Sequence, residues 1–296
     1  MNIVDAHHHI WRQADLPWLT GPMQPRIFGP YEAIRRDYPI AEYRDDIRST
    51  GVVQSVYVQA NWPVDRFEDE VAWVQSVGDE TGWPHGIVGY CDLTVPDARP
   101  ALDRLARYPA MRGVRQQFHW HENLLYRFAA SPDLARDAAV RRNVARLADY
   151  GWSFDLQVFA GQMPGAAELA AACPTTTFVL QHAGLLEDTS VSGWALWRSG
   201  MGQLAAQPNV VSQLSAFGTL LHRNDPTHIA RLVGETVSIF GADRCLYGSN
   251  FPIEKLWTSY PALIEAFRAA ARGLSDAAQR AIFADTARRV YRLASR

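Results

Sequence analysis

The chain has 296 residues, of which 48% are hydrophobic and 20% charged, a balance typical of a folded globular protein and not of a disordered one. Its 29 Lys and Arg residues nearly offset 31 Asp and Glu residues, and no basic block stands out, which argues against nucleic acid or a membrane surface as a partner. No signal peptide or membrane span is visible and the three cysteines are widely spaced, so we expect a cytoplasmic protein that acts on a small molecule.

The chain begins with a histidine motif directly behind the apolar pair at positions 3 and 4. Alternate side chains of a strand share a face, so Asp5, His7 and His9 are expected on one face and Ala6 and His8 on the other. Two imidazoles at i and i+2, where a buried strand ends, can converge on one metal ion or one substrate oxygen. The alternatives are a solvated histidine run, a structural role and the remnant of a tag, the last disfavoured by the flanking apolar residues.

The stretch after this motif, residues 13–37, is irregular and carries Pro17, Pro22, Pro25 and Pro30 among several aromatic residues. Irregular segments of this length inside a compact domain usually have a function. We interpret it as a lid over the end of the first strand.

Short apolar runs then alternate with amphipathic helical segments along the whole chain. The expected strands are 2–7, 52–59, 86–93, 112–118, 153–159, 177–182, 210–214 and 245–249. The expected helices are 67–81, 97–108, 135–150, 166–172, 194–206, 226–241, 261–272 and 275–294, the last capped by Ser275. This alternation predicts an α/β fold, a single (β/α)8 TIM barrel over residues 1–296. An open doubly wound sheet is the alternative, but no G-x-G-x-x-G loop follows the first strand.

Polar and aromatic residues gather where these strands end, which is where TIM barrels hold their active sites. The candidate residues are His7, His9, Trp11, Gln59, Trp62, Arg115, His119, His121, Gln157, His182 and Asn250. Polar groups on buried strands are costly unless they are paired or used. Alternatives are a structural ion pair for Arg115, a satisfied core position for His182, a solvated position for His119 and His121, and core packing for the tryptophans.

The motifs resemble the amidohydrolase superfamily. They are Asp-Ala-His-x-His-x-Trp from residue 5, Gly-Val-Arg from 113, Gln-His-Ala-Gly from 181 and Tyr-Gly-Ser-Asn-Phe-Pro from 247. The branch that they most resemble contains TIM-barrel hydrolases such as sugar lactonases and 2-pyrone-4,6-dicarboxylate lactonase. The resemblance implies a hydrolase that opens a lactone or cyclic ester of a sugar acid or dicarboxylate. It also implies that His7, His9 and His182 bind a metal or polarise the carbonyl, and that Arg115 holds the oxyanion or a carboxylate.

The chain departs from this family at strand 8, where an aspartate usually takes a proton from the attacking water and Asn250 stands instead. An amide cannot accept that proton, so Asn250 is expected to orient water or substrate. The candidate replacement bases are Asp92, Glu122, Asp155, His182 and Glu254. Gln157 stands near the family's metal-bridging position of strand 5, which argues against a binuclear site.

Three neutral histidines suit one divalent ion such as Zn²⁺, but some members of this branch resemble metal-free lactonases, so both states remain open. The expected substrate contacts are Gln59, Trp62, Gln157, His119, His121 and Trp11. Two other functions also remain open: a non-oxidative decarboxylase, and a barrel that binds a sugar acid or lactone with little turnover. Barrels of this size often form homodimers, and this assembly is left open too.

Overall fold

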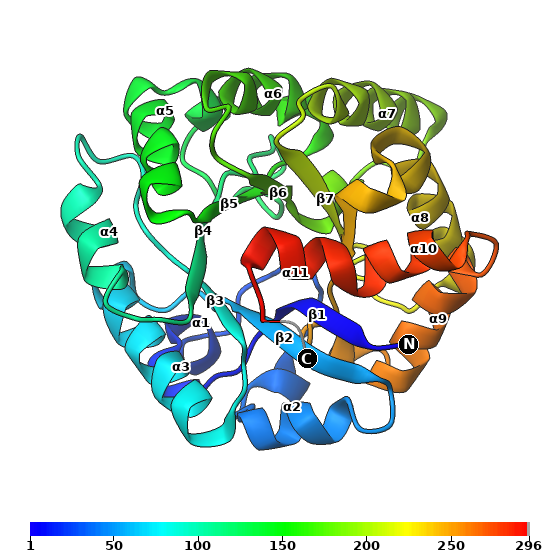
Figure 1. The fold of residues 1–296 in the computed structure, drawn as a ribbon, viewed down its shortest axis with the longest axis horizontal. Coiled ribbons are helices and arrows are strands. Elements are labelled where there is room, and N and C mark those ends of the chain that lie inside the picture. The colour runs from blue at the N-terminus through cyan, green and yellow to red at the C-terminus, as the bar shows by residue number, and fades with distance from the viewer. Residues whose placement is uncertain (295–296) are drawn as a thin grey trace.

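The computed structural model describes residues 1–294 as a barrel of parallel strands inside a ring of helices (Figure 1). Eight strands lie side by side in chain order, and every neighbouring pair is parallel. They are β1 (Ile3–His8), β2 (Val52–Val58), β3 (Gly86–Gly89), β4 (Met111–Gln117), β5 (Ser153–Gln157), β6 (Phe178–Leu180), β7 (Val210–Leu214) and β8 (Cys245–Tyr247). The predicted (β/α)8 barrel is confirmed.

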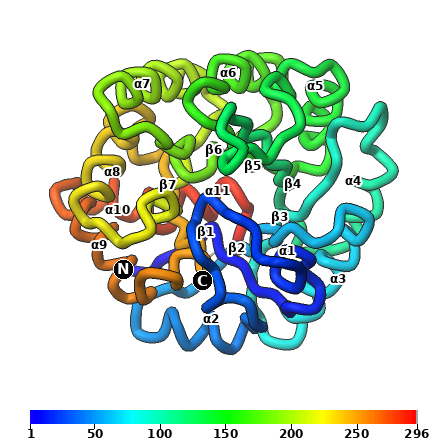
Figure 2. The backbone as a smooth tube through the Cα atoms, turned by 180° about the vertical axis from the view of Figure 1, so that it is seen from behind, coloured from blue at the N-terminus to red at the C-terminus, as the bar shows by residue number. Residues whose placement is uncertain are grey.

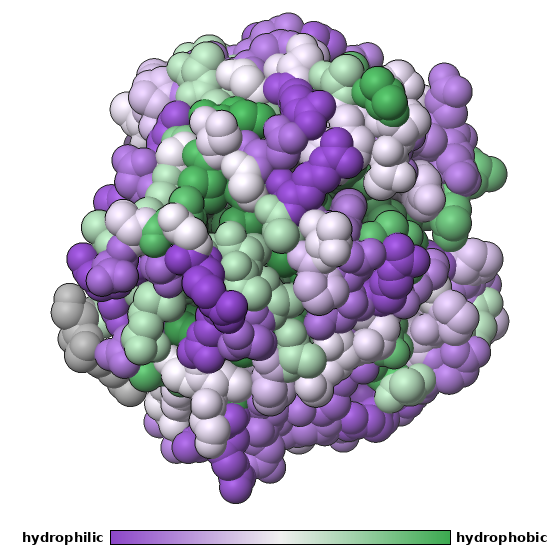
Figure 3. Space-filling view, turned by 90° about the vertical axis from the view of Figure 1, so that its right-hand side faces the viewer, coloured by the Kyte–Doolittle hydropathy of each residue, from purple (hydrophilic) through white to green (hydrophobic). Residues whose placement is uncertain are grey.

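Helices connect successive strands around the outside of the barrel, and the last helices of the chain follow the final strand. The helices are α1 (Pro17–Thr20), α2 (Ile40–Asp46), α3 (Phe67–Thr81), α4 (Arg99–Leu105), α5 (Ala138–Ala145), α6 (Met163–Ala172), α7 (Val191–Ala205), α8 (Pro226–Phe240), α9 (Tyr260–Ala271), α10 (Asp276–Arg280) and α11 (Thr286–Tyr291). None of the helices within residues 1–294 is long and apolar enough to cross a membrane. Figure 3 shows one face of the molecule, on which hydrophilic and hydrophobic residues are mixed.

The barrel closes between the ends of β8 and β1, at the histidine motif. The backbone N–H of Asn250 donates to the carbonyl of His7 at 2.7 Å, and the N–H of His9 donates to the carbonyl of Phe251 at 2.7 Å. Gly248 makes this approach possible, since a Cβ atom there would lie 2.6 Å from the Cβ of His7. The seam of the barrel therefore fixes the backbone of three candidate residues.

A core of small and branched apolar side chains fills the barrel below this end, with Val4, Ala6, Val56, Val179 and Leu246 among its members. The same cluster includes Ala287 and Tyr291 of α11, which crosses the opposite opening of the barrel (Figure 1). Seen from behind, the segment after β1, with α1, lies at the other end (Figure 2). One end of the barrel is thus plugged by a helix, and the carboxyl ends of the strands face away from it.

The expected alternation along β1 is wrong at Asp5 and at Ala6. Ala6 lies in the core inside the barrel, so it does not share a face with His8, which stacks on Tyr43. Asp5 does not share a face with His7 and His9, because its carboxylate accepts the hydroxyls of Tyr43 on α2 and Tyr260 on α9, at 2.9 and 3.0 Å, outside the barrel. The reason is a break in the β1–β2 register between Asp5 and His8. A bulge of this kind lets neighbouring residues escape strict alternation.

The predicted helices match the structure well where the amphipathic pattern is long, as in α3, whose predicted bounds are those observed. The last predicted helix, 275–294, is instead two helices around a π turn at Ala281–Asp285. Its predicted cap is confirmed, since Ser275 accepts the N–H of Ala278 at 3.2 Å. The helix α2 lies just after the predicted lid segment and was not expected.

Candidate active site

Two histidines near the start of the chain meet a third, from the turn after β6, at the carboxyl end of the barrel. The ring centroid of His7 lies 5.1 Å from that of His9 and 4.8 Å from that of His182. His8 points away and stacks on Tyr43 at 3.9 Å. The strand ends therefore bring His7, His9 and His182 together, as the motif spacing predicts.

The partners of His7 and His9 determine which ring nitrogen carries the proton. The Nδ1 atom of His9 lies 2.7 Å from the carbonyl of Val58, which can only accept, so Nδ1 carries the proton. The Nδ1 atom of His7 lies 2.7 Å from Oε1 of Gln213, whose own Nε2 donates to the carbonyl of Ala6 at 3.0 Å. That second bond fixes the orientation of the amide, so His7 also donates from Nδ1; the 3.3 Å contact with the Gln181 amide is weaker.

His182 is held in the same tautomer by an indirect route to the same glutamine. Its Nδ1 atom lies 2.7 Å from Oγ of Ser215, and that hydroxyl donates to Oε1 of Gln213 at 3.2 Å. With its proton directed to Gln213, the Ser215 oxygen accepts from His182. All three imidazoles thus have Nε2 as the unprotonated nitrogen, and one amide, Gln213, orients two of them.

The three rings are neutral, which leaves their lone pairs available. Burial, with positive charge nearby, lowers the pKa of His9 to about 3 and holds the pKa of His7 and His182 well below their usual range. The Nε2 atom of His7 is buried and has no hydrogen-bond partner within residues 1–294.

These donors suit a divalent ion, since metal-bound imidazoles characteristically donate their other nitrogen to a neighbouring acceptor. No group of three His, Cys, Asp or Glu side chains in the described part of the chain is already spaced as a complete ligand set. The three histidines therefore fit a divalent ion by the chemistry of their Nε2 atoms and by their tautomer.

Arg115 on β4 provides the positive charge of the site. It is buried, its Nη1 donates to Oε1 of Gln181 at 3.3 Å, and its Nη2 donates to the carbonyl of Gln59. Burial lowers its pKa to about 10, with Asp155 and Glu70 nearby opposing the shift, so the guanidinium remains charged at neutral pH. No ion pair within residues 1–294 engages it, which argues against the structural alternative and leaves its charge directed at the cavity.

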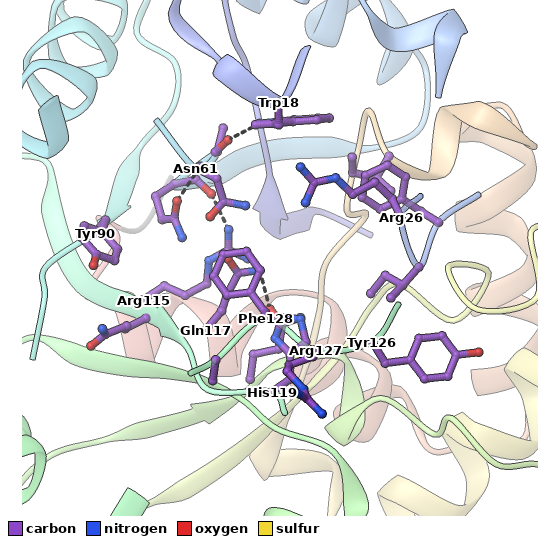
Figure 4. Close-up of a pocket in the computed structure, with 18 of the residues that line it drawn as sticks. Trp18, Arg26, Asn61, Tyr90, Arg115, Gln117, His119, Tyr126, Arg127 and Phe128 are labelled. Carbon is purple, nitrogen blue, oxygen red and sulfur yellow. Dashed lines mark hydrogen bonds between the residues drawn. The ribbon is translucent and has the colours of Figure 1, made fainter. Parts of the chain in front are cut away.

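A cavity of about 1120 Å³ opens over these groups (Figure 4). The segment 17–28 forms one wall with Trp18 and Arg26, and the loop after β4 forms another with Tyr126, Arg127 and Phe128. Of the candidate residues, those that line the cavity are His9, Trp11, Gln59, Trp62, Arg115, His119, Gln157, His182 and Asn250.

Two candidate residues do not line this cavity in the structure. His7 lies behind His9 and His182 and is fully buried. His121 lies in the loop after β4, where its Nδ1 accepts the backbone N–H of Asn123 at 2.8 Å and its ring packs on Tyr126. The expected contact between His121 and substrate is therefore not supported by its position.

Asn250 lies at the cavity floor with its backbone in the left-handed region, at φ 56°. Its Nδ2 donates to Oγ1 of Thr219 at 3.4 Å. His182 has φ 58°, also left-handed. Such conformations are costly in residues other than glycine and cluster at functional sites. The left-handed residues in the turns after β6 and β8 therefore support a functional site at this end of the barrel.

Several residues that complete the site have no motif in the sequence. Gln213 and Ser215 are two apart on and after β7, a pattern that suggests one shared face but no role. Thr219 lies in the loop after β7 and Glu254 begins a short 3-10 helix after β8, and no repeated spacing in the sequence relates the two. Only the hydrogen-bond network in three dimensions identifies Gln213, Ser215 and Thr219, and it joins Glu254, already a candidate base from the sequence, to Thr219.

Comparison with known proteins places the chain among relatives of the same length and fold. The Amidohydrolase family model matches residues 4–293. The chain is 34% identical over 296 residues to the uncharacterized protein y4mH of Sinorhizobium fredii, covering 98% of each. It is 30% identical over 307 residues to the L-fucono-1,5-lactonase of Burkholderia multivorans, covering 98% of this chain and 96% of that protein.

Solved structures give the same result. A crystal structure of an amidohydrolase from Burkholderia multivorans with bound zinc superposes with a TM-score of 0.83 at 26% identity. The match covers 99% of this chain and 100% of that one.

Proposed function

The chain belongs to the amidohydrolase family, and from this premise we propose that it is a hydrolase that opens the ester bond of a lactone. The observation that carries the proposal is the meeting of three neutral imidazoles beside one buried guanidinium: His9, His182 and Arg115 line a single cavity, and the ring of His7 lies against those of His9 and His182. The 30% identity to an L-fucono-1,5-lactonase along nearly the whole chain supports the substrate class.

Arg115 and Asn250 have different roles in the proposed ester hydrolysis. Arg115, fixed by Gln181 and the carbonyl of Gln59, is placed to bind the carbonyl oxygen as it gains negative charge. A buried, pre-oriented cation stabilises such a developing charge more than solvent does, because it needs no reorganisation during the reaction. Asn250 at the floor orients the water or the ring oxygen.

A divalent ion such as Zn²⁺ would be held by Nε2 of His7, His9 and His182. When bound, it supplies Lewis acidity that lowers the pKa of a coordinated water toward about 7. Gln213, Ser215 and the carbonyl of Val58 keep the three rings in the tautomer that this binding requires. Elemental analysis of the purified protein separates this arrangement from direct polarisation of the carbonyl by imidazole and guanidinium.

The charges along the cavity favour a lactone that carries an anionic group. Among the described residues that line it, three are arginines, namely Arg26, Arg115 and Arg127, and one is an acidic residue, Asp92. The Nε atom of Arg26 is buried and has no partner within residues 1–294. The lactone of a dicarboxylic acid, including a dicarboxylic sugar acid, keeps one free carboxylate that would pair with these cations, whereas a neutral lactone would leave them uncompensated.

The test is turnover of a panel of sugar-acid, neutral sugar and dicarboxylate lactones by the purified protein, followed by the acid released on ring opening. We expect hydrolysis of at least one anionic lactone and its loss in His182→Ala and His7→Ala. Turnover that survives both substitutions would contradict the assignment of the site. Release of CO2 without net acid would instead indicate a decarboxylase.

A further inference from the structure

A fully buried carboxyl lies directly beneath the floor of the cavity. Glu254 follows β8 by a few residues and is 0% exposed. Its Oε1 accepts the hydroxyl of Thr219 at 2.9 Å, and its Oε2 accepts the indole N–H of Trp257 at 3.0 Å. Gly218 packs so closely over it that an added Cβ would lie 2.5 Å from Oε2. A buried carboxyl of this kind is costly, and neither the barrel core nor an ion pair explains it.

The hydroxyl of Thr219 connects this carboxyl to the cavity. Thr219 and Asn250 both line the cavity, whereas Glu254 does not. Thr219 Oγ1 receives the Asn250 amide at 3.4 Å and donates its own proton to Glu254. A hydrogen-bonded path therefore runs from the cavity through Thr219 to Glu254, and Asn250 fixes the direction of the Thr219 hydroxyl.

We propose that Glu254 is the proton acceptor of this site and that it works through the Thr219 hydroxyl, in place of the carboxylate that Asn250 lacks. The inference rests on the proposed lactone hydrolysis and names the group that manages its proton. Thr219 is the residue that meets the reacting water, and Glu254 acts through it as a positioning residue.

The proton balance of this step closes within the site. As the water oxygen bonds to the lactone carbonyl carbon, one O–H bond of the water breaks and its proton passes to Thr219 Oγ1, which gives its own proton to Glu254. The tetrahedral centre then collapses, and the bond between the carbonyl carbon and the ring oxygen breaks. The proton returns through Thr219 to the leaving alkoxide, so the net reaction is lactone plus water to hydroxy acid.

The other carboxylates named from the sequence are engaged elsewhere. Asp92 lines the cavity on the β3 side, where its Oδ1 accepts from Thr94 and from Gln116. Asp155 lies inside the barrel and accepts from Ser153, Tyr291 and Gln181. Glu122 lies on an exposed part of the loop after β4. Glu254 is the candidate that is joined to the cavity floor beside Asn250.

The electrostatics of Glu254 are those of a base near neutral pH. Burial raises its pKa to about 7, against the hydrogen bonds from Thr219, Trp257, Asn250 and the Gly218 N–H, which lower it. The nearby Tyr247 hydroxyl stays neutral, because burial and the carboxylates around it hold its pKa well above its usual range. General bases are most effective when their pKa lies near the working pH.

The experiment is the pH dependence of kcat/KM on a lactone that the wild-type protein hydrolyses. We expect kcat/KM of the wild-type protein to fall as the pH drops below about 7, because one group becomes protonated; this fall is the acid limb of the profile. Glu254→Gln should lower kcat by about 100-fold or more and abolish this acid limb. Glu70→Gln is the matched control: Glu70 is equally buried, its pKa is also raised to about 7, and its Oε1 accepts from Tyr57 and the Ala60 N–H. It should keep the limb.

A second pair of variants decides the question if Glu254→Gln does not fold. Thr219→Val keeps the shape of the side chain but removes the hydroxyl, and it should lose activity as Glu254→Gln does. Thr219→Ser keeps the hydroxyl and should retain the acid limb. An acid limb that persists in Glu254→Gln or in Thr219→Val overturns the inference and leaves lactone hydrolysis standing. Absence of turnover by the wild-type protein on every lactone would contradict the proposed function itself.

Discussion

The residue on which the geometry of the site most depends is Gln213, which contacts no part of the cavity directly. Its Oε1 accepts from His7 and from Ser215, and Ser215 in turn holds His182. Its Nε2 is anchored to the carbonyl of Ala6, so the amide cannot flip without losing a buried hydrogen bond. One side chain of β7 thus sets the tautomer of an imidazole on β1 and of another in the turn after β6.

Replacing Gln213 with leucine should lower kcat/KM about 10- to 100-fold, the usual cost of removing a partner that orients a functional histidine. The loss should fall mainly on kcat, because the residue does not line the cavity. Steady-state kinetics on the best lactone measures it.

The matched control is Gln54→Leu. Gln54 is also buried on a strand, but it bonds the carbonyl of Ala294 and the Arg288 guanidinium near the C-terminus of the chain. Gln54→Leu should lower the free energy of unfolding but keep kcat/KM within about twofold of the wild-type value, the effect expected of a change remote from the site. Equal losses in the two variants would show that Gln213 acts only through folding.

At the scale of the elements, periodic pattern was sufficient for most strands and helices but not for the seam between β8 and β1. The i, i+2 spacing of His7 and His9 predicted their convergence. It misplaced Asp5, because the register break in β1 depends on pairing with β2, a contact remote in sequence. Arg115 and Asn250 were located by motif. The roles of Gln213 and Thr219 depend on partners on other elements, and the contact with Thr219 distinguishes Glu254 from the other candidate bases.

The seam itself can be tested at Gly248. A Cβ there would lie 2.6 Å from His7 Cβ and 3.1 Å from the His7 backbone nitrogen, so Gly248→Ala must push β8 away from β1. We expect a loss of about 1–3 kcal/mol in the free energy of unfolding, as for other overpacked sites, together with a fall in activity as His7 shifts. Chemical denaturation and kinetics on the same preparation measure both.

Gly234→Ala is the control for Gly248→Ala, and we expect it to have the opposite effect on stability. Gly234 lies on the exposed side of α8, and a Cβ there meets nothing within 4 Å. Alanine should stabilise the helix by up to about 1 kcal/mol and leave activity unchanged. If Gly248→Ala were as harmless as Gly234→Ala, the close approach of β8 to β1 would not matter for the site.

At the scale of the whole molecule, buried carboxyls should make stability depend on pH. Burial raises the pKa of Glu70 from 4.5 to about 7, so the folded state keeps a proton that the unfolded state releases. The contribution of Glu70 to stability is therefore full below about pH 4.5 and falls as pH rises toward about 7. Each pH unit over which the two states differ by one proton changes the free energy of unfolding by about 1.4 kcal/mol.

Denaturation of the wild-type protein and Glu70→Gln at several pH values between about 4.5 and 7 tests this. The variant should show a flatter dependence, because its amide does not titrate, and the difference should level off above about pH 7. Identical slopes for the two proteins would mean that Glu70 ionises in the folded state as freely as in the unfolded chain.

In the proposed reaction, water opens a lactone at the carbonyl carbon, in the cavity beside His7, His9 and His182. Hydrolysis of the best lactone in water enriched in ¹⁸O, followed by mass spectrometry of the product, tests this most directly. We predict one heavy oxygen in the new carboxylate with the wild-type protein and no enzymatic product with His182→Ala. An unlabelled carboxylate, or equal labelled product from the variant, would contradict it.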